Sequence, residues 1–183
     1  MLINLGDKSK TVTFKSNGIS NCLELCKLIL KNYGITSYGS SNNVFKLMYE
    51  SNGKLLHYGA NIKENYTNAI ECIDRHLKNN RPIIIGVNHT FGNTYNEGTT
   101  DHFVVIYGKG YDEKLKMYYY TYYEVGKTDI EYVYNDELNR FYYDDKTYNL
   151  YDITSSRSDK KRFDVIQVRP NDGILNGTVN HKE

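Results

Sequence analysis

Hydrophobic positions in the first half of the chain recur at the spacing of two amphipathic helices. The first predicted helix covers Cys22–Tyr33 and ends at Gly34, and the second covers Ile62–Lys78. The residues predicted to form the buried face of the first helix are Cys22, Leu25, Cys26, Ile29 and Tyr33. Those predicted to form the buried face of the second helix are Ala69, Ile70, Ile73 and Leu77. Each helix therefore has one side that requires a packing partner.

Patterns typical of β-strands fill most of the remaining chain. The turn residues Ser51-Asn52-Gly53 separate two strand-like segments and predict a hairpin, and the apolar run that follows Pro82 predicts a central strand. The predicted strands are Thr11–Lys15, Val44–Glu50, Lys54–Tyr58, Pro82–Val87, His102–Tyr107, Met117–Val125, Phe141–Ile153 and Phe163–Val168. Because two helices precede a run of strands, we predict an α+β fold with an antiparallel sheet.

Length and composition indicate one globular domain. The chain has 183 residues, of which 39% are hydrophobic and 25% are charged, and it contains no repeat and no linker. A chain of this size can bury a core without disulfides or metals. We predict a single domain over residues 1–170, followed by a loose tail over residues 171–183.

Charge and hydropathy argue against two classes of partner. The 23 basic and 22 acidic residues are mixed along the chain, and a formal net charge of +1 gives no electrostatic footprint for nucleic acid. No apolar run approaches the roughly 20 residues that span a bilayer, so we expect no membrane insertion. The chain reaches Asp7 and Lys8 after only a few apolar positions. We therefore expect a protein that is made in the cytoplasm without a signal peptide.

Cysteine and tyrosine usage narrow the chemistry further. Three cysteines form neither a disulfide framework nor a zinc-binding pattern, so we expect reduced thiols. The chain also has 19 tyrosines and no tryptophan. An A/T-rich genome is one explanation for this bias, and a tyrosine-built face that binds sugar or peptide is the other.

Cys22 is the first candidate for chemistry, because it lies in the first turn of the first predicted helix. Asn21 or Ser20 is predicted to cap this helix. Unpaired amide donors and the helix macrodipole at this position lower the pKa of a thiol toward the nucleophilic thiolate. The alternative is that Cys22 simply continues the buried face, as we expect for Cys26 and Cys72.

A thiolate nucleophile needs an imidazole that accepts and returns a proton. Among the five histidines, His102 is favoured because it opens a predicted strand directly after the polar loop Gly98–Asp101. The strand would fix the backbone while the ring reaches solvent, although a purely structural histidine is the alternative. His89 ends the apolar strand and is a second candidate, whereas His57 and His76 are predicted to have polar neighbours.

Glu124 is the candidate for the group that orients the imidazole. If the strands that contain His102 and Glu124 form a hairpin with Gly108 opposite Tyr118, then Glu124 lies opposite His102 on the same face. A shift of one residue would send Glu124 to the other face, where it would be an ordinary surface glutamate. Asp101 and Asp129 are weaker substitutes for this role.

The order of these residues resembles that of the papain-like superfamily of cysteine hydrolases. The segment Asn21–Gly34 is similar to the cysteine-bearing helix of bacteriocin-processing (double-glycine) peptidases, and Asp101–Gly108 resembles the histidine strand of that family. Tyr123–Gly126 stands where the family has an Asp-Pro pair. Papain-like cell-wall amidases, including toxin effectors that bacteria inject into rivals, share the same order of Cys and His. The resemblance extends from Asn17 to Gly126.

Two positions depart from the pattern of the peptidase family. The family supplies a glutamine before the cysteine as an oxyanion donor, whereas Lys15–Ile19 contains none. Asn17, Asn21 and the backbone amide of Cys22 are the candidate replacements, with Asp101 as a further candidate for substrate binding. The glycine that follows the nucleophile in the family is replaced here by leucine.

The resemblance implies an α+β papain-like fold in which the helix that bears Cys22 packs on an antiparallel β-sheet. It also implies a cysteine hydrolase that cleaves an amide bond, with Cys22 as nucleophile, His102 as proton shuttle, Glu124 as orienting acid, and no metal or organic cofactor. The expected substrate is a peptide, in particular a peptidoglycan peptide cut by an antibacterial effector. Such an effector would use a leaderless secretion route and have an immunity protein as partner. The alternatives are a peptidase or deamidase that acts on proteins, and an inactive papain-like module that only binds.

Overall fold

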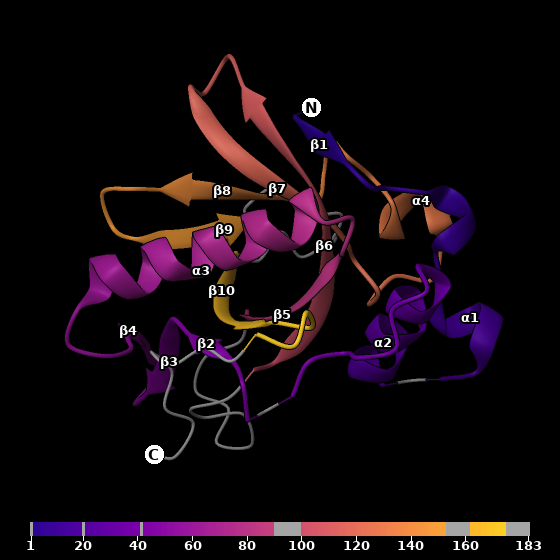
Figure 1. Ribbon diagram of the computed structural model, residues 1–183, viewed down its shortest axis with the longest axis horizontal. Coiled ribbons are helices and arrows are strands. Elements are labelled where there is room, and N and C mark those ends of the chain that lie inside the picture. Colours follow the sequence, from indigo (N-terminus) through magenta and orange to yellow (C-terminus); the bar gives the residue numbers. More distant parts are fainter. Residues whose placement is uncertain (1, 20, 41, 90–99, 153–161, 175–183) are drawn as a thin grey trace.

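The computed structural model describes residues 2–19, 21–40, 42–89, 100–152 and 162–174, and for Ser16 and Asn17 it describes the backbone alone. Figure 1 shows the arrangement of the helices and strands. In chain order these elements are β1 (Ile3–Asn4), the 3-10 helix η1 (Lys8–Lys10), α1 (Phe14–Asn17), α2 (Cys22–Asn32), β2 (Phe45–Lys46), β3 (Met48–Ser51), β4 (Lys54–His57), α3 (Ile62–Lys78), β5 (Ile83–Asn88), β6 (His102–Asp112), β7 (Met117–Tyr123), α4 (Ile130–Val133), β8 (Arg140–Asp144), β9 (Asn149–Asp152) and β10 (Phe163–Arg169).

Six strands of the main sheet close into an antiparallel barrel. Their order is β6-β5-β10-β9-β8-β7, and β7 pairs again with β6 to complete the ring. The short strands β1 and β2 attach to β6 and β10, while β3 and β4 form a separate hairpin. In Figure 1, α3 crosses in front of β9 and β10, and α2 lies at the other end of the molecule beside the lower part of β6.

The closed barrel shows that the predicted fold class is wrong. The protein is mostly antiparallel sheet with few helices, and it is not an α+β papain-like fold with a helix on a sheet. Closure depends on the pairing of β10 with both β5 and β9 and on the hairpin of β8 and β9. Linear order and hydrophobic pattern do not determine which strands pair around a ring, so the number of barrel strands was not predictable from them.

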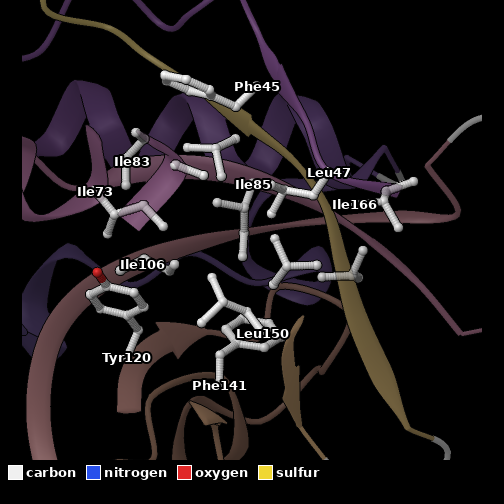
Figure 2. Close-up of a cluster of buried hydrophobic side chains, with 14 of the residues drawn as sticks. Phe45, Leu47, Ile73, Ile83, Ile85, Ile106, Tyr120, Phe141, Leu150 and Ile166 are labelled. Atoms are coloured by element: carbon white, nitrogen blue, oxygen red, sulfur yellow. The ribbon is translucent and has the colours of Figure 1, made fainter. Parts of the chain in front are cut away.

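Alternate residues of the barrel strands point into an inner hydrophobic cluster, because successive side chains of a strand face opposite sides. In β5 and β6 the inward residues include Ile83, Ile85, Val104 and Ile106, all fully buried. The residues that Figure 2 labels in this cluster are Phe45, Leu47, Ile73, Ile83, Ile85, Ile106, Tyr120, Phe141, Leu150 and Ile166. Ile73 comes from α3, so the apolar face of that helix shares the barrel core.

The outward residues of the same strands form a second cluster with α2. Ile84 and Val105 pack with Leu25 and Ile29 of the helix, and all four are fully buried. Strands β5 and β6 therefore separate two hydrophobic layers. This packing fixes the helix against the wall of the barrel, with its first residue, Cys22, near the start of β6.

Both long helices were predicted within one residue of their ends, but three predicted strands were wrong. Val44–Glu50 is divided into β2, which joins the main sheet through β10, and β3, which forms the separate hairpin with β4. The residues Thr11–Lys15 do not form a strand, since α1 begins at Phe14. The predicted strand Phe141–Ile153 is instead the hairpin of β8 and β9, which reverses near Tyr148 at a positive φ of 58°. Ile153 lies outside the described residues.

The C-terminal end of the described chain packs against α3 and β5. Asn171 is 2% exposed, and its side chain accepts a hydrogen bond from Arg81 at 2.7 Å and donates one to the carbonyl of Pro82 at 2.9 Å. The packed body thus extends at least to Asn171, and residues 175–183 of the predicted tail lie outside the described residues.

Within the described ranges, no helix is both long enough and apolar enough to cross a membrane.

Candidate active site

Cys22 is the first residue of α2 and is half-buried. The predicted cap is present: the side-chain oxygen of Asn21 accepts hydrogen bonds from the backbone N–H groups of Leu23 at 3.0 Å and Glu24 at 3.4 Å. The cap starts the helix directly before the thiol, where the helix macrodipole favours a negative charge. Because α2 is anchored to the barrel wall, the position of the thiol is fixed by the core.

His102 is the first residue of β6 and lies opposite Val87 of β5. Asp101, the residue before β6, fixes the start of this strand by two hydrogen bonds. Its backbone N–H donates to the carbonyl of Val87 at 3.0 Å, and its carboxylate accepts from the backbone N–H of His89 at 2.9 Å. The His102 side chain is consequently held in a rigid setting and is 8% exposed.

A β-bulge brings Glu124 to the face of His102. Near the turn, β6 and β7 pair with Gly108 opposite Thr121, but beyond an irregularity Ile106 lies opposite Tyr122. One extra residue of β6, Tyr107, accounts for this shift. Without this extra residue, Glu124, which directly follows β7, would face the outer side of the sheet, because a shift of one residue reverses the face.

The predicted register of this hairpin was wrong, although the face was right. Gly108 does not lie opposite Tyr118, which pairs with Tyr111. Beyond the bulge, Tyr123 lies opposite Val105. Glu124 is the next residue, so it is a diagonal cross-strand neighbour of His102 on the same face of the sheet. Diagonal neighbours are within reach of long side chains, which suits a glutamate here.

The three predicted residues form a connected chain of contacts. The His102 Nε2 atom and the Glu124 Oε1 atom are 2.5 Å apart, and the same carboxylate oxygen accepts the backbone N–H of Gly126 at 2.9 Å. The His102 ring also forms a hydrogen bond with the Cys22 thiol, for which Nδ1 is the remaining ring nitrogen. The contacts that the sequence predicted are present, while the catalytic roles of the residues stay predictions.

The site sets the protonation of both reactive groups. Burial raises the pKa of the Cys22 thiol, but the hydrogen bond and charge of His102 and the amides of Phe103 and Leu23 outweigh burial, so the pKa lies below its ordinary value. Burial alone would lower the pKa of His102, but the Glu124 carboxylate and the Cys22 thiol raise it above its ordinary value. The arrangement therefore favours a thiolate beside an imidazolium.

The other candidate residues have different positions. The Asn21 side-chain oxygen is used by the helix cap, and the Asp101 carboxylate binds the backbone of His89. The side chain of Asn17, the third candidate for the oxyanion site, lies outside the described residues. Asp129 precedes α4 as its N-cap residue and is not the partner of His102.

Two features of the site were not predicted. The backbone N–H of Phe103 donates to the Cys22 sulfur, because the start of β6 approaches the start of α2. Gly126 lies against the histidine–glutamate pair, and a Cβ atom at this position would be 3.0 Å from Glu124 Oε1 and 3.2 Å from His102 Cε1. The backbone contact has no signal in the sequence, whereas a glycine two residues after the acid was visible and was read only as part of the family resemblance.

Among the residues that the structure describes, no group of three or more His, Cys, Asp or Glu side chains has an arrangement that could hold a metal ion.

Comparison with known proteins adds no relative to this picture. No family model, no curated protein and no solved structure matches this chain. The function is therefore inferred from the geometry around Cys22.

Proposed function

We propose that the protein is a cysteine hydrolase that cleaves an amide bond. The observation that carries this proposal is the chain of contacts from the Cys22 thiol through the His102 ring to the buried Glu124 carboxylate. A polarised thiol, a proton carrier and an orienting acid are the components of nucleophilic acyl transfer. Each component is held by a different part of the fold, so the arrangement does not follow from local sequence alone.

In the first half-reaction the Cys22 thiolate attacks the carbonyl carbon of the amide and forms a tetrahedral oxyanion. The His102 imidazolium then donates its proton to the leaving nitrogen, the C–N bond breaks, and a thioester remains on Cys22. Glu124 stays ionised and holds the ring by the 2.5 Å contact, which stabilises the cationic form of the imidazole.

In the second half-reaction water attacks the thioester. Neutral His102 accepts a proton from the water, the new C–O bond forms, and the C–S bond breaks to release a carboxylic acid. The sulfur leaves as the thiolate, and the proton on His102 restores the starting ion pair. No external oxidant or cofactor enters either half-reaction.

The backbone N–H of Cys22 is the proposed donor to the tetrahedral oxyanion. The first N–H groups of a helix have no intrahelical acceptor, and those of Leu23 and Glu24 are used by the Asn21 cap. An amide at the start of α2, directly on the nucleophile, satisfies the geometric requirement of such a donor.

Peptidoglycan peptides are the proposed substrate, and an antibacterial effector is the proposed context. The support for this step is the similarity of Asn21–Gly34 and Asp101–Gly108 to bacteriocin-processing peptidases, and the order of Cys and His shared with cell-wall amidases. Peptidase or deamidase action on a protein substrate uses the same triad chemistry and differs only in the bond that is broken.

Mass spectrometry of purified peptidoglycan fragments, before and after incubation with the protein, tests this proposal. We expect new peptide fragments that require Cys22, with Cys22→Ala as the inactive variant and Cys72→Ala as the matched cysteine control. Ammonia release without chain cleavage would identify a deamidase instead. An unaltered substrate together with a Cys22 thiol that iodoacetamide alkylates no faster than free cysteine would identify an inactive binding module.

A further inference from the structure

Arg169 is the last residue of β10 and packs on Phe103, which borders the same hydrophobic cluster as Cys22. It is half-buried, and its guanidinium carbon is 4.6 Å from the centre of the Phe103 ring. Its Nε atom donates a hydrogen bond to the side-chain oxygen of Gln167 at 3.0 Å. These contacts hold the stem and one edge of the guanidinium and leave its terminal nitrogens as the remaining donors.

Gln167, the side chain that binds Arg169, packs against a glycine. Gly86 of β5 lies between Phe103 of β6 and Gln167 of β10 in the sheet. A Cβ atom at Gly86 would collide with Thr100 and with the Gln167 side chain, and these two side chains are hydrogen-bonded to each other at 2.5 Å. The Gln167 amide thus donates to Thr100 through its nitrogen and accepts from Arg169 through its oxygen, and these two contacts support the guanidinium over Phe103.

The charge of Arg169 has no carboxylate partner in the described part of the chain. Arg75 pairs with Asp172 at 2.7 Å and Arg162 pairs with Asp164 at 2.9 Å, so other arginines of this protein do have such partners. Burial lowers the pKa of Arg169, and the acidic group that acts against this effect is the thiol of Cys26. A partly buried cation without a counterion is costly unless a ligand completes it.

Phe103 connects this cation to the nucleophile. Its backbone N–H donates to the Cys22 sulfur, while its ring lies under the guanidinium of Arg169. Cys26, one helical turn below Cys22, is close enough to Arg169 that the two groups shift each other's pKa. A substrate whose amide reaches Cys22 would thus extend over the surface of Phe103 toward Arg169.

We propose that Arg169 binds a carboxylate of the substrate, so that the protein prefers amides that carry a free carboxylate close to the scissile bond. A guanidinium offers paired N–H donors that match the two oxygens of a carboxylate. This inference rests on the proposed function, since it takes Cys22 as the point of attack. It restricts the substrate class to acidic peptides, which neither the triad nor its resemblance specifies.

Two alkylating reagents of nearly equal size test the proposal without a known substrate. Iodoacetate carries a carboxylate and iodoacetamide carries a neutral amide, and both react with a thiolate by forming an S–C bond and releasing iodide. The rate of each reaction at Cys22 is measured by peptide mass mapping in the wild type and in Arg169→Gln. We expect the ratio of the iodoacetate rate to the iodoacetamide rate to fall about fivefold or more in the variant.

Lys31→Gln is the matched control, because it removes one exposed positive charge from the other end of α2. We expect it to keep the wild-type ratio. Arg169→Lys keeps the charge but not the paired donors, and we expect an intermediate ratio. Melting curves of all variants establish that they are folded, and Arg169→Lys provides the measurement if Arg169→Gln does not fold.

An unchanged ratio of the two rates in folded Arg169 variants would overturn the proposal. If both rates fall by the same factor, the guanidinium has a structural role and does not bind the carboxylate. Failure of the proposed hydrolase has a different signature. In that case iodoacetamide would react with Cys22 no faster than with free cysteine, and His102→Gln would not change its rate, whatever the ratio between the reagents.

Discussion

The described part of the protein contains two Cys–His pairs, and their contrast shows what favours a thiolate. Cys22 and His102 come from different elements, α2 and β6. Cys72 and His76 lie one turn apart on α3, both fully buried, with the sulfur 3.8 Å from the imidazole Nδ1 atom. Proximity of a cysteine and a histidine is therefore common to both regions.

The partners of the two imidazoles differ. His76 Nε2 accepts the backbone N–H of Asn171 at 2.9 Å, so its Nδ1 carries the proton and donates to the carbonyl of Cys72 at 2.8 Å. Burial lowers the pKa of His76 and raises the pKa of Cys72 to about 12. Both ring nitrogens of His76 bind the backbone, and the Asp172 carboxylate, 3.8 Å from Nε2, is beyond hydrogen-bond distance. Burial therefore outweighs this carboxylate, and the pair stays neutral.

At the other pair a carboxylate replaces the backbone partner. Glu124 favours the charged form of His102, and the cation in turn favours the thiolate of Cys22. The third group therefore distinguishes the two pairs: the Glu124 carboxylate favours ionisation of Cys22 and His102, whereas the backbone partners of His76 do not. His76 thus binds the C-terminal segment through Asn171, whereas the Cys22–His102 pair is polarised as the proposed chemistry requires.

The largest expected effect distinguishes the two cysteines. Cys22→Ala should reduce hydrolysis by a factor of about 10⁴ or more, because it removes the nucleophile. Cys72→Ala should keep most of the activity and lower the free energy of unfolding by about 1 kcal/mol, since it loses buried packing. Assays of fragment release together with melting curves measure both effects, and Cys26→Ala should behave like Cys72→Ala.

An active Cys22→Ala variant would end the hydrolase proposal. Equal loss of activity in Cys22→Ala and Cys72→Ala would show instead that the comparison between the pairs is wrong, provided that melting curves show both variants folded at the assay temperature.

The sequence predicted the contents of the candidate site better than the fold around it. Asn21 and the apolar spacing of α2 identified the helix start, and the polar-to-apolar change at His102 identified the strand start; both are local signals. The partnership with Glu124 depends on the extra residue Tyr107, and a bulge has no consistent sequence signal. The face was right because the bulge compensates for an incorrect hairpin register.

The closed barrel was not predicted because one of its turns, between β8 and β9, has no clear sequence signal. The turn between β8 and β9 contains neither glycine nor proline, so the segment was interpreted as one strand. The Asp144 carboxylate builds this turn by accepting the N–H groups of Lys146 at 3.0 Å and Thr147 at 3.2 Å. A single Asp can build a turn in this way, and without a glycine or proline beside it the hydrophobic pattern does not mark the turn.

The second prediction removes the group that distinguishes the pairs. Glu124→Gln should lower the turnover rate by a factor of about 10² to 10⁴ and leave a rate clearly above that of Cys22→Ala, since the nucleophile and the oxyanion donor remain. Glu50→Gln makes the same change at another buried glutamate, 2% exposed and hydrogen-bonded to Asn88 at 3.0 Å. We expect this control to retain activity; a wild-type rate in Glu124→Gln would remove Glu124 from the triad.

The third prediction concerns pH. Because the pKa of Cys22 is lowered, the thiolate is protonated only at a pH below the ordinary pKa of a thiol. Because the pKa of His102 is raised, the imidazolium loses its proton only at alkaline pH. Activity should therefore have a broad plateau around neutrality, with an acidic limb from Cys22 and an alkaline limb from His102.

Iodoacetamide alkylation measures the acidic limb directly. His102→Gln keeps a hydrogen-bond donor beside buried Glu124 but removes the cation, so the alkylation profile of Cys22 should move upward toward the free-thiol value of about 8.5. At pH 7 the alkylation rate should fall by roughly tenfold. Cys72 should stay unreactive across this range in both proteins, and an unmoved profile would mean that Cys22 and His102 are not coupled.

The smallest expected effect tests how closely the glycine after Glu124 must approach the pair. In Gly126→Ala the new methyl group would lie 3.0 Å from Glu124 Oε1 and 3.3 Å from His102 Nε2, which is tighter than ordinary contact. Gly126 is exposed and does not have a positive φ, so we expect the variant to fold with a nearly unchanged melting temperature. The methyl group must push the carboxylate away from the ring, and we expect the turnover rate to fall by about threefold to tenfold, with the alkylation profile of Cys22 moving upward by less than in His102→Gln. Thr128→Ala, at an exposed position two residues further on, should change neither quantity. A fully active Gly126→Ala variant would show that the histidine–glutamate pair tolerates displacement, and the third group would then act through its charge alone rather than through a fixed position.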